Sequence, residues 1–130
     1  DQVHFTGFVP GEDLPLFLDS ADVFFMPSEA ELLSIACLEA MASGLPLLAA
    51  RSKALPELVD HGQNGYLFEP GDPADAARHM AMLAGHPEQF ASMSAASLRK
   101  VQTHSVNNVL TLYERLYRAC MDGRPIPLAS

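Results

Sequence analysis

The sequence predicts an α/β fold with a Rossmann-like parallel sheet and flanking helices. Residues 22–27 and 45–50 are short apolar runs without polar alternation, which is typical of strands that are covered on both faces. Segments with helical periodicity separate such runs, and strands that alternate with helices form parallel sheets. With 130 residues, of which 48% are hydrophobic, the chain is long enough for one domain with a real core.

Each predicted element has a local signal. Residues 3–8, VHFTGF, alternate and contain β-branched and aromatic side chains, which predicts a short strand. Residues 11–21 place apolar side chains on one face and predict a short helix. Ser34, a residue type that caps helices, precedes the run IACLEAMA, which Gly44 and Pro46 end.

The second half of the chain is mainly helical. Asn64 and Gly65 predict a turn, and Asp72 followed by Pro73 predicts the start of a helix. The elements predicted after the central helix are a strand at 45–50, a short helix at 56–59, a strand at 66–69, and helices at 73–86, 87–101 and 106–120. We expect one domain over residues 1–122 and a disordered or draped tail at 123–130.

Charge and cysteine content exclude several classes of function. The chain has 8 Lys and Arg against 16 Asp and Glu, a formal charge of −8, which argues against a nucleic-acid surface. Cys37 and Cys120 form no C-x-x-C pair, so we expect both to be reduced core residues of a cytoplasmic protein. No apolar stretch reaches the roughly 18 residues that span a bilayer, so no transmembrane segment is expected.

The sequence lacks the common metal and phosphate motifs. Its five histidines form no H-x-x-x-H pair and no cluster with cysteine, so a metal site is not expected. The G-x-S-x-G elbow of serine hydrolases is absent, as are the glycine-rich loops that bind phosphates or dinucleotides. We therefore expect neither a metal ion nor a cofactor.

Two glutamates, Glu31 and Glu39, interrupt the segment PSEAELLSIACLEAMASGLP, which is otherwise nearly all apolar or small. Because a buried unpaired carboxylate is costly, each must lie near water, be paired, or hold a polar group. A strand, a loop and a helix N-terminus follow one another here, and in a parallel sheet this point attracts anions. On spacing alone, a plainer interpretation is favoured, in which Ser28 and Glu31 form a capping box and Glu39 lies on a polar helix face.

The whole segment 27–50 favours the ligand-binding interpretation over the capping box. PSEAELLSIACLEAMASGLPLLAA resembles P-S-x-x-E-x-x-G-L-x-x-L-E-A-M-A-x-G-x-P, the signature of the retaining nucleotide-sugar glycosyltransferases of the GT-B architecture, the glycosyl transferases group 1 family. The strings VHFTGF and LPELVDHGQNGYL also resemble segments of that family, so the resemblance covers residues 3–83. It implies part of a GT-B C-terminal domain that binds a nucleotide-sugar donor substrate.

The resemblance implies a role for each central residue. Glu31 contacts the transferred sugar near the departing phosphate and is the expected catalytic residue, whereas Glu39 accepts hydrogen bonds from the ribose hydroxyls. The backbone of Leu33, Ser34 and Ile35 faces the diphosphate and the sugar. These roles suit the chemistry, because a carboxylate accepts two hydroxyl donors well and free amides at a helix start stabilise developing negative charge.

Other positions follow or depart from the family pattern. Phe8 and Val9 match residues beside the nucleotide base, although packing of the Phe8 ring into the core or under the following helix is at least as good an interpretation. Ser34 stands where the family usually has glycine, so its side chain either crowds the phosphate or donates a hydrogen bond to it. Residues 52–54 replace a common glycine pair, and we expect Lys53 to be solvated.

The resemblance also implies parts that this chain lacks. Complete enzymes have an N-terminal acceptor lobe. Their C-terminal lobe starts with two further strands, which lie in the sheet between the strands predicted here at 3–8 and 22–26, and with a loop whose Arg and Lys neutralise the diphosphate. We therefore expect the chain to be inactive by itself and to need the missing lobe or a parent chain. The apolar stripe at 106–120 and open strand edges predict a homodimer or larger assembly. The competing functional class is a non-catalytic α/β module that acts in self-association or assembly.

Overall fold

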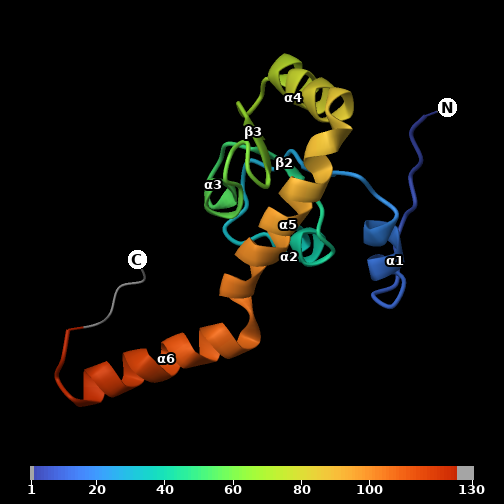
Figure 1. The fold of residues 1–130 in the computed structure, drawn as a ribbon. Helices are drawn as coiled ribbons and strands as arrows, with labels where there is room; N and C mark the ends of the chain where they lie inside the picture. Colours follow the sequence, from blue (N-terminus) through green and yellow to red (C-terminus); the bar gives the residue numbers. More distant parts are fainter. Residues whose placement is uncertain (1, 126–130) are drawn as a thin grey trace.

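The computed structural model describes residues 2–125, which form a three-stranded parallel sheet flanked by helices (Figure 1). The strands are β1 (Phe24–Met26), β2 (Leu47–Ala50) and β3 (Gly65–Phe68). The helices are α1 (Leu14–Asp19), α2 (Ile35–Ala42), α3 (Leu55–Leu58), α4 (Pro73–Gly85), α5 (Phe90–Val101) and α6 (Val106–Met121), with short 3-10 helices at Pro87–Gln89 and Gln102–His104. This architecture confirms the predicted α/β class.

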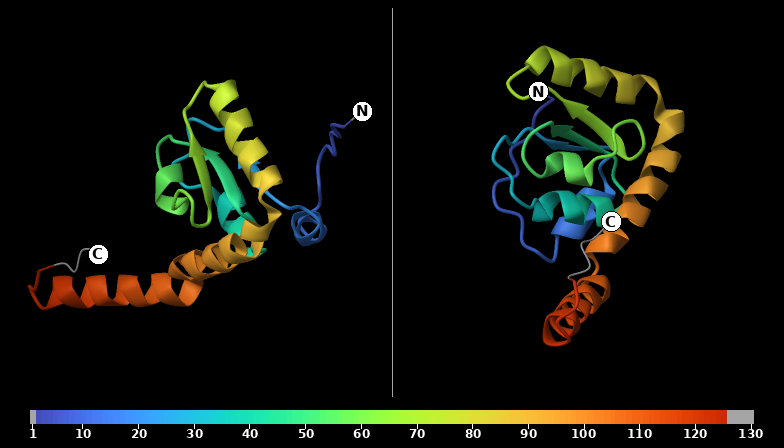
Figure 2. Two further views of the ribbon diagram at one scale, coloured as in Figure 1. Left: turned by 45° about the horizontal axis from the view of Figure 1, so that its top comes forward. Right: turned by 90° about the vertical axis from the view of Figure 1, so that its left-hand side faces the viewer.

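The sheet lies between two layers of helices. Its strand order is β1-β2-β3, with Phe24 beside Leu47 in the first pair and Leu47 beside Gly65 in the second. Helices α2 and α3 lie on one face of the sheet and α4 lies on the other, while α5 packs against α2 (Figure 2). Every residue of β2 is buried, as its apolar run predicts, and every residue of β3 is buried as well. The same prediction is wrong for β1, because Phe24 and Met26 are only half-buried and Phe25 is 41% exposed.

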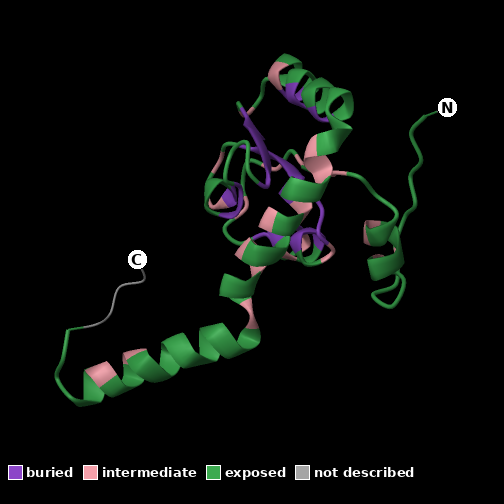
Figure 3. Ribbon diagram, viewed as in Figure 1, coloured by how far each residue is buried: buried purple, intermediate pink, exposed green. Residues whose placement is uncertain are grey.

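The core lies on both faces of the sheet, against helices α2, α3 and α5 and against α4, which contributes Ala76 and Leu83 (Figure 3). Met41, Leu47, Leu48, Leu55 and Met93 are almost completely shielded from solvent. Full burial of such a side chain stabilises a fold by roughly 1.5–3 kcal/mol. The strands and α2 therefore form a well-packed base, from which the loops at the carboxyl ends of the strands extend.

Gly65 allows β2 and β3 to pair closely. Its φ is 153°, and a Cβ atom at this position would lie 1.9 Å from the carbonyl oxygen of Leu47. The neighbouring Asn64 is buried and holds the turn, because its side-chain amide donates to the Leu58 carbonyl oxygen and its Oδ1 accepts from the Asp60 N–H. A turn that ends at Asn64 is therefore confirmed, whereas Gly65, predicted as part of the turn, is the first residue of β3 and is required by its contact across the sheet.

The predicted strand at 3–8 is wrong. Residues 2–10 have no regular secondary structure, and the side chains of Val3, Phe5 and Phe8 are 71%, 97% and 92% exposed. A strand needs backbone partners, but in the described part of the chain the sheet ends at β1 and no strand lies beside this segment. β1 is therefore an edge strand of the described sheet.

Helix α6 leads away from the α/β unit (Figures 1 and 2). It confirms the predicted last helix, yet none of its residues is buried. Cys120 is consequently an exposed free cysteine, which corrects the expectation that it belongs to the core, whereas Cys37 is buried as predicted. No helix within residues 2–125 has the length and hydropathy needed to cross a membrane.

The expected tail at 123–130 lies partly outside the described residues. Residues 123–125 follow α6 closely, because the Arg124 N–H donates to the Ala119 carbonyl oxygen at 2.9 Å. The Gly123 N–H donates to the Cys120 carbonyl oxygen, so both bonds satisfy acceptors at the end of α6. The prediction for residues 126–130 concerns a segment that the structure does not describe.

Candidate functional site

The candidate site lies at the edge of the sheet where the parallel strands end. β1 continues into the loop 27–34, which leads to α2, and β2 continues into a turn that leads to α3. The two connections are hydrogen-bonded to each other. Ser52 Oγ donates to the Glu29 carbonyl oxygen at 2.8 Å, and the Ala54 N–H donates to the Glu31 carbonyl oxygen at 3.2 Å. The loop that carries Glu31 is therefore fixed in place by the next turn.

Ser34 begins α2 as the sequence predicts. Its backbone is extended, and its buried Oγ accepts a hydrogen bond from the Cys37 N–H at 3.3 Å. The N–H groups of Ile35 and Ala36 precede the first intrahelical bonds and have no partner within the helix. These groups and the positive end of the helix dipole give the start of α2 a partial positive charge, which favours an anion.

The capping box that the spacing of Ser28 and Glu31 allows does not form. Ser28 Oγ accepts from the Ala30 N–H at 3.4 Å, and no helix begins before Ile35. Glu31 is half-buried, and its charge acts on Cys37 in the first turn of α2. Burial raises the pKa of the Cys37 thiol, the N-cap hydroxyl lowers it, and Glu31 raises it further. The thiol is therefore protonated near neutral pH, and Glu29 and Glu31 are the acidic residues of the loop 27–34.

Glu39 lies in the second turn of α2 and is exposed. It lines a groove of about 230 Å³ between α1 and α2, opposite Leu14, Pro15 and Leu18. Within residues 2–125 it forms no ion pair, so its carboxylate oxygens are open to a ligand. An exposed position also suits a residue that only forms the polar face of a helix. Substitution of Glu39 distinguishes that role from ligand binding.

The structure brings together five of the seven predicted site residues in the loop 27–34 and the first two turns of α2. They are Glu31, Leu33, Ser34, Ile35 and Glu39. Phe8 and Val9 lie apart from them, in the N-terminal segment that stands off the sheet before α1 (Figure 1). Phe8 is 92% exposed, so the alternative in which its ring packs into the core is wrong.

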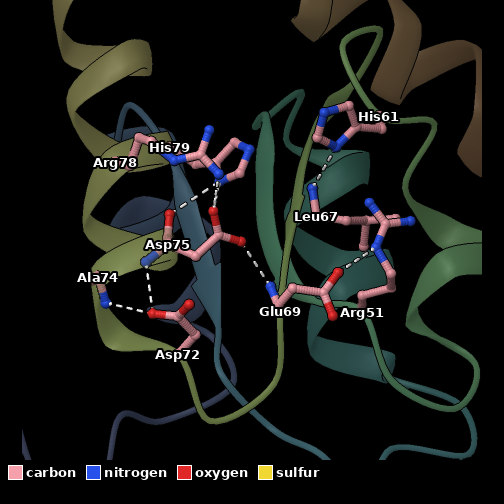
Figure 4. Close-up of polar contacts among 9 residues, drawn as sticks. All are labelled: Arg51, His61, Leu67, Glu69, Asp72, Ala74, Asp75, Arg78 and His79. Atoms are coloured by element: carbon pink, nitrogen blue, oxygen red, sulfur yellow. Dashed lines mark hydrogen bonds and ion pairs between the residues drawn. The ribbon is translucent and has the colours of Figure 1, made fainter.

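A second group of polar side chains joins β3 to α4 (Figure 4). The Asp75 carboxylate accepts from the Glu69 N–H at 2.8 Å and forms an ion pair with Arg78. Asp72 caps α4 by accepting from the N–H groups of Ala74 and Asp75, each at 3.0 Å. The hydrogen bond from Glu69 lowers the pKa of the Asp75 carboxyl, and Arg78 lowers it further against the effect of burial.

His61 covers the free edge of β3. Its Nδ1 accepts from the Leu67 N–H at 3.1 Å (Figure 4). The centroid of its ring lies 5.1 Å from that of Tyr66 and 5.5 Å from that of His79. Burial lowers the pKa of His61, and the charges of His79 and Arg51 lower it further, so the ring is neutral near pH 7. In the described part of the chain, no group of three or more His, Cys, Asp or Glu residues could hold a metal ion. We assign this cluster a structural role.

An apolar hollow of about 420 Å³ lies between β1, β3 and α4. The rings of Phe25 and Phe68 stack in it at 5.6 Å between centroids, and Met80 forms part of its wall. The only charged side chains that line it are Glu29 and Asp72, which are both acidic. An apolar hollow with only acidic side chains offers a diphosphate no cation, whereas the start of α2 offers free N–H groups.

The chain matches a family model and several curated proteins. The model of the family described as glycosyl transferases group 1 matches residues 1–99. The chain is 44% identical over 82 residues to the sulfoquinovosyl transferase SQD2 of Arabidopsis thaliana, which covers 61% of this chain and 16% of that protein. It is 33% identical over 123 residues to the D-inositol 3-phosphate glycosyltransferase of Streptomyces avermitilis, covering 95% and 26%. The chain thus spans less than a third of the length of either relative.

Solved structures share the fold. A sucrose-phosphate synthase from Thermosynechococcus elongatus superposes with a TM-score of 0.84 at 24% identity, covering 94% of this chain and 31% of that one. The C-terminal domain of a group 1 glycosyl transferase, LpcC from Francisella tularensis, gives 0.68 at 28% identity, covering 76% and 51%. Anabaena HepE in complex with UDP and glucose gives 0.77 at 25% identity, covering 94% and 32%. These likenesses confirm the predicted fold.

Proposed function

Because this chain belongs to the glycosyl transferases group 1 family, we propose that it binds the nucleotide-sugar donor of a retaining glycosyl transfer reaction. One observation supports this function above the others. The loop with Glu31 is fixed against the next turn and ends at the Ser34-capped start of α2, with Glu39 exposed one turn further on. The HepE complex with UDP and glucose supports a nucleoside diphosphate sugar as the class of ligand.

In the proposed site, Glu39, Glu31 and the backbone amides at the start of α2 bind different parts of the donor. Glu39 accepts hydrogen bonds from the ribose hydroxyls, and Glu31 accepts from the hydroxyls of the transferred sugar. The amides of Leu33, Ser34 and Ile35 lie where negative charge grows on the diphosphate as its bond to the sugar breaks. Donors that are already oriented toward that charge stabilise the transition state without reorganising, so they assist departure of the diphosphate. The acceptor then bonds to the same face of the sugar, which retains its configuration.

We propose that the acceptor is bound by a further lobe, in a parent chain or in a partner. The relatives that this chain matches are more than three times its length, which leaves room for such a lobe in those proteins. The 130-residue chain should therefore bind the donor diphosphate and transfer sugar at a negligible rate. Transfer or donor hydrolysis by the chain alone, at the rate of an intact enzyme, would contradict this division of roles.

Calorimetric titration tests the donor proposal. We expect at least one of UDP, ADP and GDP to bind the chain more tightly than its own nucleoside, because the diphosphate meets the start of α2. If none of the three binds while circular dichroism shows an intact fold, the proposal is wrong. The exposed apolar face of α6 then favours the second candidate, a non-catalytic module that acts in self-association, for which light scattering would show an assembly.

A further inference from the structure

The net negative charge of the chain comes from its first 50 residues. Residues 1–50 contain eight Asp and Glu and no Lys or Arg, whereas residues 51–130 contain eight of each kind, so their formal charges are −8 and 0. The loop with Glu31 and the whole of α2 belong to the acidic part. A diphosphate at the proposed site therefore meets like charge, and a helix N-terminus offers only about half a positive charge against it. The site needs a cation from elsewhere.

Most of the Lys and Arg side chains are already paired. The described residues include all eight, and five of them form ion pairs there: Arg51 with Glu69, Arg78 with Asp75, Lys100 with Asp60, Arg118 with Glu114, and Arg124 with Asp122. The other three are Lys53, Arg99 and Arg115. Arg99 lies on α5 and Arg115 on α6, whereas Lys53 lies in the turn after β2, at the edge where the candidate site is.

Lys53 adjoins the candidate site through the backbone. The residue before it, Ser52, donates its hydroxyl to the carbonyl oxygen of Glu29. The residue after it, Ala54, donates its N–H to the carbonyl oxygen of Glu31. Lys53 is thus held between two anchors on the loop that leads to α2, and its side chain is exposed.

Lys53 also occupies a backbone conformation that suits glycine. Its φ is 49°, and among the described residues it is the one non-glycine with a positive φ. An L-residue in this region is strained by its Cβ atom, whereas glycine adopts it without steric cost. A lysine therefore stands here at a steric cost that glycine would avoid, at the edge of the sheet where the candidate site lies.

We propose that Lys53 is a donor-binding residue whose ammonium group neutralises the diphosphate of the nucleotide-sugar. This inference rests on the proposed function of the site. Lysine carries its charge on a flexible four-carbon stem and binds phosphate as a point charge, so it can follow the diphosphate as the bond to the sugar breaks. Lys53 thereby supplies the cation that residues 1–50 lack.

The test compares variants of the whole 130-residue chain by calorimetric titration with UDP, ADP and GDP and with their nucleosides. Lys53→Gly and Lys53→Asn remove the charge and tolerate a positive φ, so both should fold, and the glycine variant should melt at the same or a higher temperature. We expect each to weaken diphosphate binding about 3- to 10-fold at low salt, with nucleoside binding unchanged and a smaller effect at high salt. Lys53→Arg should bind the diphosphates with a dissociation constant within about twofold of that of the unsubstituted chain.

Arg115→Ala is the matched control, because it removes the same charge from α6 and should leave diphosphate binding unchanged. Diphosphate affinity that survives both neutral substitutions at Lys53 would overturn the inference and leave the proposed function standing. An equal loss in Arg115→Ala would also overturn it, because the effect would then follow net charge rather than position. If the unsubstituted 130-residue chain binds none of the three diphosphates, the proposed function fails and the role of Lys53 fails with it.

Discussion

Substitution of Glu39 by alanine is the sharpest perturbation of the proposed donor site. The side chain is exposed and forms no ion pair within residues 2–125, so its removal should change the free energy of unfolding by less than about 0.5 kcal/mol. Hydrogen bonds to a charged group contribute about 1.5–3 kcal/mol, so loss of the ribose contact should weaken binding of the nucleoside diphosphate about 10- to 150-fold.

Calorimetry with UDP, ADP and GDP measures the loss in binding, and urea denaturation measures the stability of the same sample. Glu57→Ala is the matched control, because Glu57 is an exposed glutamate on α3 that forms no ion pair in the described part of the chain. We expect the control to bind the diphosphate with the same dissociation constant as the unsubstituted chain. An unchanged dissociation constant for Glu39→Ala, with an intact fold, would refute the ribose contact and favour the interpretation of Glu39 as part of a polar helix face.

The remaining predictions concern turnover, stability and assembly. In a protein that joins this chain to an acceptor lobe, Glu31→Ala should lower kcat much more than nucleotide affinity, because its proposed contact is with the sugar; equal damage to nucleotide binding would contradict that role. The free energy of unfolding should fall between pH 7.5 and 5.5, because the pKa of His61 is lowered from 6.5 in the folded chain and the unfolded chain takes up the proton first. This part of the fall should be absent in His61→Ala, and an equal fall in both proteins would show that His61 is not responsible. Gly65→Ala should cost about 3 kcal/mol or more in urea denaturation, because the added Cβ would overlap the Leu47 carbonyl; a cost under about 1 kcal/mol would contradict the close pairing of β2 and β3. Size-exclusion chromatography with light scattering should show a homodimer or larger assembly that Leu110→Lys on α6 disrupts, whereas a monomer at micromolar concentration would refute self-association.

Elements with strong local signals could be predicted from the sequence. The apolar runs at 22–27 and 45–50 predicted β1 and β2, and the cap residues Ser34 and Asp72 predicted the starts of α2 and α4. In each case the deciding interaction is local, such as a hydroxyl or carboxylate that accepts an N–H two or three residues later. Five of the seven predicted site residues came together for the same reason, since they lie in one loop and the helix that follows it.

Features that depend on distant partners could not be predicted in this way. Residues 3–8 have the composition of a strand, but pairing decides whether a strand forms, and no neighbouring strand is present within residues 2–125. Cys120 lies on an apolar stripe, yet α6 leads away from the core and leaves it exposed. His61 and Leu67 lie in one string that resembles the family, but nothing in that string predicts that the His61 ring accepts a hydrogen bond from the Leu67 N–H. The bond between Asp75 and the Glu69 N–H was also not predicted, although Asp75 in the first turn of a capped helix was a partial signal.

The central claim is that the diphosphate of a nucleotide-sugar binds where β1 leads into α2. The most direct test is an NMR titration of the isotope-labelled chain with UDP, ADP and GDP, which follows each backbone amide separately. The proposed site predicts the largest shifts at the amides of Leu33, Ser34 and Ile35, with a smaller shift at Glu39. Shifts confined to the apolar hollow around Phe68, or no shift with any of the three nucleotides, would contradict it.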